Sequence, residues 1–275
     1  MEALRWLGGP ALSLAIALAS AAGSAATVED LYQATTILTG QGEEGRPQGL
    51  AECLKDVLVK VSGDPRLRDD PRVAAMAPQA PSMVRAFRYR DRMEEFPVHD
   101  EQGTRDRPYD LTADFYPDRI DAVLRDLGSQ PWSAERPRIA VFLGVRNIAA
   151  SYVFADDARR DNGQRDSLLL QSRRLGIPVA LPSQADLKAA GLDLETLWKA
   201  QPTSLDEATK RLGADLPLVG TMRFSDEVHG WIADWQLAAK GRIWKWQVRG
   251  VNFDEAFRSA MRGTAQILSG TGQPG

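Results

Sequence analysis

Two neighbouring segments, 231–239 and 242–249, constrain the fold most, because together they indicate a tryptophan-rich β-hairpin. Lys240-Gly241 between them is a two-residue turn typical of hairpins. This turn places Trp235 opposite Trp246. Side chains alternate between the two faces of a sheet, so the aromatic residues gather on one face, which must be covered. The residues expected there are Trp231, Ala233, Trp235, Leu237, Trp244, Trp246 and Val248, with Leu237 opposite Trp244 and Ala233 opposite Val248.

The helix expected after residue 252 offers that cover. Its apolar stripe includes Phe253 and Phe257, and it follows the hairpin directly. We therefore predict that the aromatic face belongs to the core. The alternative is an exposed platform that binds a glycan or a protein, since large bare apolar patches usually mark binding sites. The tentative partner-binding residues are thus Trp231, Trp235, Trp244 and Trp246, with core as the preferred role.

Strands and helices alternate along the rest of the chain without a regular repeat. The run 139–145 is apolar throughout, which is typical of a strand covered on both faces. Other strands, such as 109–116, alternate apolar and polar residues and have one wet face. The pattern predicts an α+β fold with mixed or antiparallel sheets and packed helices. Further expected elements are a strand at 31–38, helices at 47–61, 71–87, 117–127 and 166–175, and a helix that Ser204 to Glu207 caps, with 88–107 as a charged hairpin or loop.

These elements form two small α/β units. The first is a β-α-α-β-α arrangement, and the second closes with the hairpin and the last helix. A polar segment separates the two units. The predicted boundaries are a signal peptide at 1–26, the first unit at 27–128, a linker at 129–137, the second unit at 138–270 and a flexible tail at 271–275.

The first 26 residues have the three parts of a secretory signal peptide. Arg5 supplies a positive charge, an apolar run from Pro10 to Ala22 follows, and small residues end the segment. The apolar run is shorter than the roughly 20 residues that span a bilayer. We therefore expect cleavage after Ala26, export to the periplasm and no stable membrane insertion of the mature chain.

Residues that carry common catalytic or metal chemistry are sparse, so we predict no catalytic, cofactor-binding or metal-ligating residue. Cys53 is the single cysteine and lies on a predicted helix among apolar residues, which favours an inert buried thiol. His99 and His229 lack the neighbours that a zinc site needs. The Gly-x-Gly-x-x-Gly run at 40–45 has the spacing of a dinucleotide-binding loop, but its two glutamates would repel a pyrophosphate. A formal net charge of -3 argues against nucleic-acid binding.

Carboxylates leave one enzymatic alternative open. Because a pair of them can hydrolyse a glycosidic bond, a periplasmic hydrolase of cell-wall material is the second hypothesis. Most of the candidates lie at helix caps or on the solvent-facing side of one strand. No acid therefore stands out from the sequence as a catalytic residue. The candidates are Asp64, Asp69, Asp70, Asp110, Asp114 and Asp118.

Four parts of the sequence share a pattern with known proteins. They are the signal peptide with residues 28–32, the helix end at 57–64, the strand and helix from Tyr109 to Trp132, and the closing hairpin and helix. Together they resemble an exported family of Gram-negative bacteria catalogued as domain of unknown function 2066. The resemblance implies an uncharacterised envelope protein and assigns no functional residue. The resemblance, the signal peptide and the lack of a recognisable set of catalytic residues together favour a non-catalytic protein that binds another cell-envelope component, a protein or a glycan.

Overall fold

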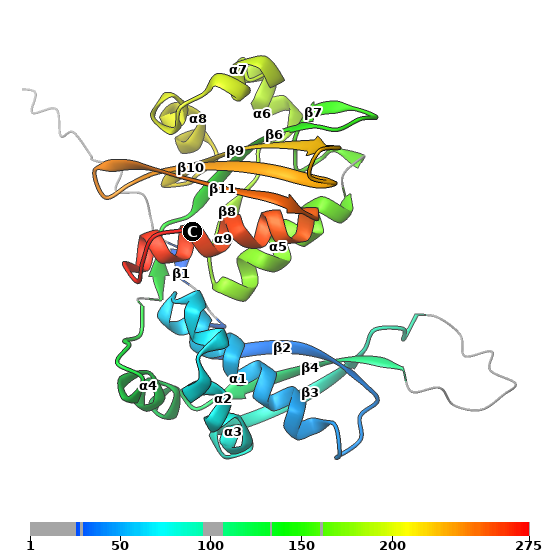
Figure 1. Ribbon diagram of the computed structural model, residues 1–275, viewed down its shortest axis with the longest axis vertical. Coiled ribbons are helices and arrows are strands. Elements are labelled where there is room, and N and C mark those ends of the chain that lie inside the picture. Colours follow the sequence, from blue (N-terminus) through cyan, green and yellow to red (C-terminus); the bar gives the residue numbers. More distant parts are fainter. Residues whose placement is uncertain (1–25, 28–29, 96–106, 133, 160–161, 275) are drawn as a thin grey trace, which may run out of the picture.

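The computed structural model describes residues 26–27, 30–95, 107–132, 134–159 and 162–274. All of the predicted signal peptide except Ala26 therefore lies outside the described residues. The α+β class is confirmed, with mixed and antiparallel sheets that pack against helices (Figure 1). Among the described residues, no helix is long and apolar enough to cross a membrane.

The first sheet has three antiparallel strands. Their order is β2 (Gln33–Thr39), β4 (Pro108–Phe115) and β3 (Val84–Asp91). In β4 the residues Leu111 and Phe115 are buried beneath the helices, as their alternation with polar residues predicts. The opposite face of this sheet carries Asp110, Thr112 and Asp114. Their partners across the strands are Gln33, Thr35 and Ile37 of β2 and Ala86, Arg88 and Arg90 of β3.

Helix α1 (Arg46–Ser62) packs on the buried face of this sheet. Pro47 in its first turn has a fixed backbone angle that suits a helix start. The helix ends at Gly63, whose left-handed φ of 70° is readily available to glycine. Its buried stripe is the one expected from the sequence and includes Leu54, Val57, Leu58 and Val61. The other helices of this unit are the short α2 (Pro71–Met76) and α3 (Ala80–Met83), and α4 (Pro117–Asp126).

Strand β3 corrects one expectation from the sequence and decides another. The predicted helix at 71–87 ends at Met83 after a short 3-10 helix at 77–79. For 88–107 the sequence left a charged hairpin or a loop open, and the antiparallel pairing of β3 with β4 agrees with the hairpin. The first unit therefore has a third strand beyond the predicted β-α-α-β-α order. The physical reason is that β3 is a mostly exposed edge strand, so its arginines resemble a solvated loop in the sequence.

The second sheet is mixed and has the order β11-β10-β9-β6-β7, with β8 also paired to β6. Strand β6 (Ile139–Arg146) runs parallel to β9 and β8, whereas the other neighbours pair antiparallel. The remaining strands are β7 (Ser151–Val153), β8 (Val179–Ala180), β9 (Leu216–Ser225), β10 (Gly230–Ala239) and β11 (Arg242–Val251).

Helices cover both faces of the second sheet, as the continuous apolar run of β6 predicts. Ile139 and Val141 of β6 belong to the cluster that includes α5 (Asn162–Leu175) and α9 (Phe253–Ser269), while Phe142 belongs to a second cluster on the other face. Figure 1 shows the second set of helices on the far side of the sheet from α5 and α9. They are α6 (Gln184–Ala189), α7 (Leu194–Lys199) and α8 (Asp206–Arg211).

The closing hairpin has the predicted register. Trp235 lies opposite Trp246, Leu237 opposite Trp244 and Ala233 opposite Val248. Both residues of the Lys240-Gly241 turn have positive φ, 52° and 74°, as the tight turn requires. The cap of α9 is also as expected, since the Asn252 side chain accepts a hydrogen bond from the Glu255 backbone N–H.

The predicted capping box at Ser204 is wrong. Ser204 lies inside a 3-10 helix (Pro202–Leu205), and its hydroxyl donates to the Gln201 carbonyl instead of capping α8. Helix α8 starts after Leu205 without a side-chain cap. The preceding 3-10 turn already orients the chain, so the sequence motif has no free helix end to cap.

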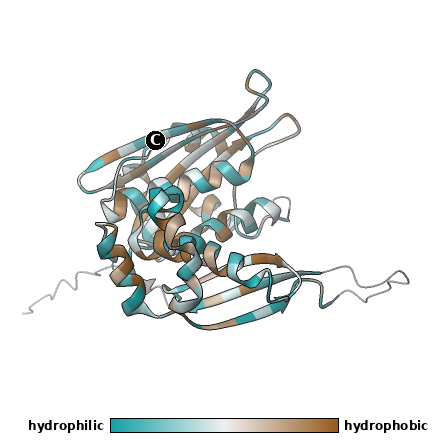
Figure 2. Cartoon of the chain, turned by 60° about the horizontal axis from the view of Figure 1, so that its bottom comes forward, coloured by the Kyte–Doolittle hydropathy of each residue, from teal (hydrophilic) through white to brown (hydrophobic). Residues whose placement is uncertain are grey.

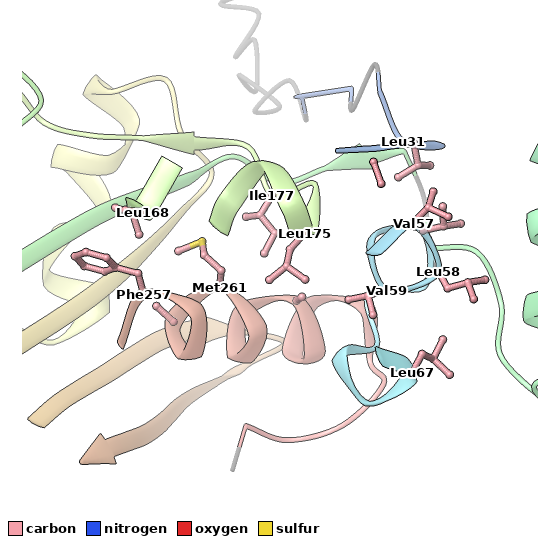
Figure 3. Packing of buried hydrophobic residues seen from close by; sticks show 14 of the residues in the cluster. Leu31, Val57, Leu58, Val59, Leu67, Leu168, Leu175, Ile177, Phe257 and Met261 are labelled. Carbon is pink, nitrogen blue, oxygen red and sulfur yellow. The ribbon is translucent and has the colours of Figure 1, made fainter. Parts of the chain in front are cut away.

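One hydrophobic cluster runs through both units. Figure 2 shows apolar segments on the helices that lie between the two sheets. At the junction, this cluster includes Val59 of α1, Leu67, Leu175 at the end of α5 and Met261 of α9 (Figure 3). The two units therefore share buried apolar surface, and unfolding one would expose the core of the other.

Arg136 connects the two units at this junction. It lies in the short strand β5 (Glu135–Arg136), which pairs with β1 (Ala26–Thr27). Its side chain is fully buried and donates hydrogen bonds to the carbonyls of Lys60, Leu175 and Gly176 at 2.7–2.9 Å. These carbonyls end α1 and α5, where a positive charge is favourable. Burial lowers the pKa of the Arg136 guanidinium to about 10, so the group stays charged at neutral pH.

Candidate functional site

The tryptophans proposed from the sequence lie on the α9 side of the second sheet. Trp235 is fully buried, Trp231 and Trp246 are nearly so, and Trp244 is half-buried. The Trp246 indole N–H donates to the Ser259 carbonyl of α9 at 3.2 Å. Helix α9 therefore covers this aromatic face in the structure, and a site open to a partner must be sought elsewhere.

The other candidates from the sequence stay apart from one another. Cys53 is buried, and burial raises the pKa of its thiol to about 12. His229 is exposed in a turn between β9 and β10, whereas His99 lies outside the described residues. The loop at 40–45 is exposed, including both of its glutamates. Within the described part of the chain, no three His, Cys, Asp or Glu side chains are grouped as they would be to hold a metal ion.

Four of the six carboxylates considered for hydrolysis bind neighbouring backbone N–H groups or arginine side chains. Asp64 and Asp70 each accept the backbone N–H of the arginine two residues on and bind its guanidinium. Asp110 and Asp114 lie on the exposed face of β4 within 3.2–3.7 Å of arginine side chains. The last two candidates, Asp69 and Asp118, lie in the 3-10 helix at 65–69 and in the first turn of α4.

The same aspartate–arginine turns line a cavity of about 630 Å³. Its two arginines, Arg66 and Arg72, already bind the carboxylates of Asp64 and Asp70 at 2.7 Å. The two carboxylates offset the charge of these arginines, so the cavity has less free positive charge to offer a ligand than its residue types suggest.

A second cavity, of about 470 Å³, lies between β2 and α5, and we call it the β2–α5 groove. Its size is typical of ligand sites, which span about 300–1,000 Å³. One wall is β2 with Thr35 and Ile37, and the opposite wall is α5 with Leu170, Arg173 and Arg174. Helix α1 and the ends of β3 and β4 complete the lining.

The groove combines apolar contact surface with positive charge. Ile37 and Leu170 are 50% and 41% exposed, which is high for such side chains. Arg173 and Arg174 are both exposed, and neither forms a direct salt bridge within the described residues, although the charge of Arg174 acts on the Asp56 carboxylate of the same groove. Basic side chains outnumber acidic ones, and the lining has a net charge of +2 although the whole chain has −3. The charged residues are Lys60, Arg90, Arg92, Arg173 and Arg174 against Asp30, Asp56 and Asp110.

Lys60 closes one end of the groove. Its ammonium group is buried and donates to the carbonyls of Asp30 and Gln33 at 2.8 and 2.9 Å. The pKa of Lys60 is lowered from 10.5 to about 8, chiefly by burial. Asp30 opposes this effect, and the nearby charge of Arg136 adds to it. Lys60 thus ties α1 to the start of β2.

This pKa predicts a pH dependence of stability. Between about pH 8 and 10.5 the unfolded chain keeps the proton that native Lys60 has released, so raising the pH through this window stabilises the native state. We expect the free energy of unfolding of the wild type to increase relative to that of Lys60→Met as the pH rises through this window. Urea unfolding at several pH values measures this difference. A difference that stays constant from pH 8 to 10.5 would contradict the lowered pKa.

The sequence did not reveal the groove, because its walls are far apart along the chain. The one local sign was Lys60 itself, a charged residue within the apolar run 57–61. Such a residue either reaches solvent or finds buried partners, and here it finds two carbonyls.

Comparison with known proteins gives one result. A family model described as Domain of unknown function (DUF8605) matches residues 25–133, which contain the three-stranded sheet and α1–α4. The match to an uncharacterised domain agrees with the resemblance seen in the sequence, but the specific family, domain of unknown function 2066, is wrong. No curated protein and no solved structure matches the chain. The wall of the groove formed by α5 lies outside the matched segment.

Proposed function

We propose that this chain is an exported, non-catalytic protein that binds another component of the cell envelope in the β2–α5 groove. The groove carries this proposal, because it joins exposed Ile37 and Leu170 to two exposed arginines of α5 that form no direct salt bridge among the described residues. Apolar surface with a few convergent charges is what a binding site needs. Four of the six acids considered for hydrolysis, Asp64, Asp70, Asp110 and Asp114, are used as caps or in ion pairs, which makes the second hypothesis the weaker one.

Export is the first part of the proposal to test. In a Gram-negative host the full chain is expected in the periplasm as a product that begins at Thr27, since the first 26 residues have the pattern of a cleaved signal. Cell fractionation and N-terminal sequencing measure both points. Leu14→Arg, which places a charge in the apolar run, should leave the chain uncleaved in the cytoplasm. Periplasmic material that still starts at Met1 would contradict cleavage.

Binding in the groove is tested by photo-crosslinking in intact cells. A photoreactive amino acid at Leu170 should give a discrete crosslinked product, because this exposed side chain lines the groove. The matched control is the same amino acid at Ile243, which is 37% exposed on β11 and lies outside the groove. Identical products from both positions, or none from Leu170, would count against the groove as the binding site.

A further inference from the structure

The groove exposes the free edge of a β-strand. Strand β2 is at the end of its sheet, and among the described residues it has β4 as its pairing strand. The Phe115 N–H donates to the Tyr32 carbonyl, and the Gly40 N–H donates to the Arg107 carbonyl. Hydrogen-bonded pairs alternate along an antiparallel ladder. The even-numbered residues of β2 therefore bond to β4, and the odd-numbered ones direct their N–H and C=O groups away from the sheet.

Part of this edge is already occupied and part is open. The Gln33 N–H donates to the Asp30 carbonyl, and the Gln33 carbonyl accepts from Lys60. The next two outward-facing residues, Thr35 and Ile37, line the groove. An unpaired edge of this kind is a template for an added strand. Lys60 closes one end of the edge, so an added strand would begin beside Thr35.

The opposite wall indicates the composition of such a strand. Arg173 and Arg174 line the groove from α5, and neither forms a direct salt bridge among the described residues. The charge of Arg174 acts on the nearby Asp56 carboxylate, but Asp56 forms its salt bridge with Arg68. Leu170 and Ile37 leave apolar surface exposed beside them. A bound strand with acidic side chains would pair with the arginines, and its apolar side chains would cover Ile37 and Leu170.

We propose that the β2–α5 groove binds an extended, acidic segment of a partner polypeptide, which adds to the edge of β2 as a fourth strand of the first sheet. This inference rests on the proposed binding function and names the class of partner. A second copy of this chain fits poorly, because two grooves of net charge +2 would repel each other. A glycan would leave the backbone groups of Thr35 and Ile37 without regular partners.

The probe is a displayed library of random nine-residue peptides selected on the purified mature chain. We expect the selected peptides to be enriched in Asp and Glu and to alternate polar with apolar residues. Their affinities are then measured by fluorescence anisotropy against three proteins: the wild type, Ile37→Pro and Ile37→Val. Proline removes the outward N–H at position 37 without removing a bond to β4, and edge strands tolerate it.

Ile37→Pro should weaken binding by about tenfold or more, whereas Ile37→Val should change it by less than about twofold, because valine keeps the N–H. A thermal melt of each variant checks that it is folded. A second measurement needs only the wild-type protein. N-methylation of the peptide amides that would face β2 should abolish binding, whereas N-methylation of the alternate amides, on the other edge of the peptide, should leave binding unchanged. Binding that is indifferent to both changes would overturn strand addition.

The acidic character is tested on α5. The double variant Arg173→Gln, Arg174→Gln should bind the selected peptides at least about tenfold more weakly and with a smaller dependence on salt. Arg125→Gln, an exposed arginine of α4 outside the groove, should bind like the wild type. A library that yields no binder, or binders without acidic enrichment, would overturn the acidic-strand inference. Crosslinking from Leu170 that persists in the Ile37→Pro protein would leave the proposed function standing while this inference falls.

Discussion

Replacing Trp235 by alanine is expected to lower the free energy of unfolding by about 3–5 kcal/mol, the cost of removing a large aromatic side chain from a packed core. The Trp235 side chain has no exposed surface. It packs so closely on Gly220 of β9 that a Cβ at Gly220 would overlap the indole ring. The surrounding strands hold this space open, so the cavity would collapse only in part. Urea unfolding followed by circular dichroism measures the loss.

Two control variants separate core packing from other effects. Trp235→Phe should lose much less than the alanine variant, because the Trp235 indole N–H has no hydrogen-bond partner in the described part of the chain and phenylalanine removes that donor. Trp244→Ala should also lose less, since Trp244 is only half-buried. A Trp235→Ala protein that unfolds like the wild type would refute the core role and return the hairpin to consideration as a binding surface.

Arg136→Met should be comparably destabilising, by about 3–5 kcal/mol, because it leaves three carbonyl acceptors unsatisfied at the buried junction, at a cost of about 1–3 kcal/mol each. The substitution leaves the carbonyls of Lys60, Leu175 and Gly176 without their donor. It also removes the guanidinium that stacks 3.9 Å from the Trp132 ring centre. Because these carbonyls end α1 and α5, we expect the contact between the two units to weaken as well.

Urea unfolding again measures the effect, and hydrogen exchange locates it. Exchange should accelerate first at the ends of α1 and α5. Arg138→Met is the matched control, since Arg138 is exposed two residues further along and its loss should stay within about 0.5 kcal/mol. Equal stabilities for the two variants would show that the buried hydrogen bonds of Arg136 contribute little.

Features with local causes were predictable. The register of the Trp235–Trp246 hairpin follows from a two-residue turn and a period of two, both visible in nineteen consecutive residues. The start and end of α1 follow from Pro47 and Gly63. The burial of β6 on both faces follows from its continuous apolar run. In each case the side chains that decide the structure are neighbours in the chain.

Features that depend on a distant partner were missed or misread. Strand β3 resembles a charged loop because its arginines bind acids of β4 that lie about twenty residues further along, as with Arg90 and Asp110. Ser204 and Glu207 have the spacing of a capping box, but Ser204 lies inside a 3-10 helix in the structure and so cannot cap α8. The third case is Arg136, which lies in the predicted linker. Its role depends on carbonyls at the ends of α1 and α5, which are distant in the sequence.

The α+β class, the paired strands of the hairpin and the apolar faces of α1 and α9 follow from the amino-acid sequence alone, because turn geometry and side-chain periodicity act over a few residues. The position of α5 opposite the free edge of β2 and the contacts of Arg136 with two helix ends depend on the folded chain. Those contacts bring together residues such as Ile37 and Arg174, and no local pattern encodes a contact across so many residues. The long-range packing of the two units creates the groove, and with it the candidate site.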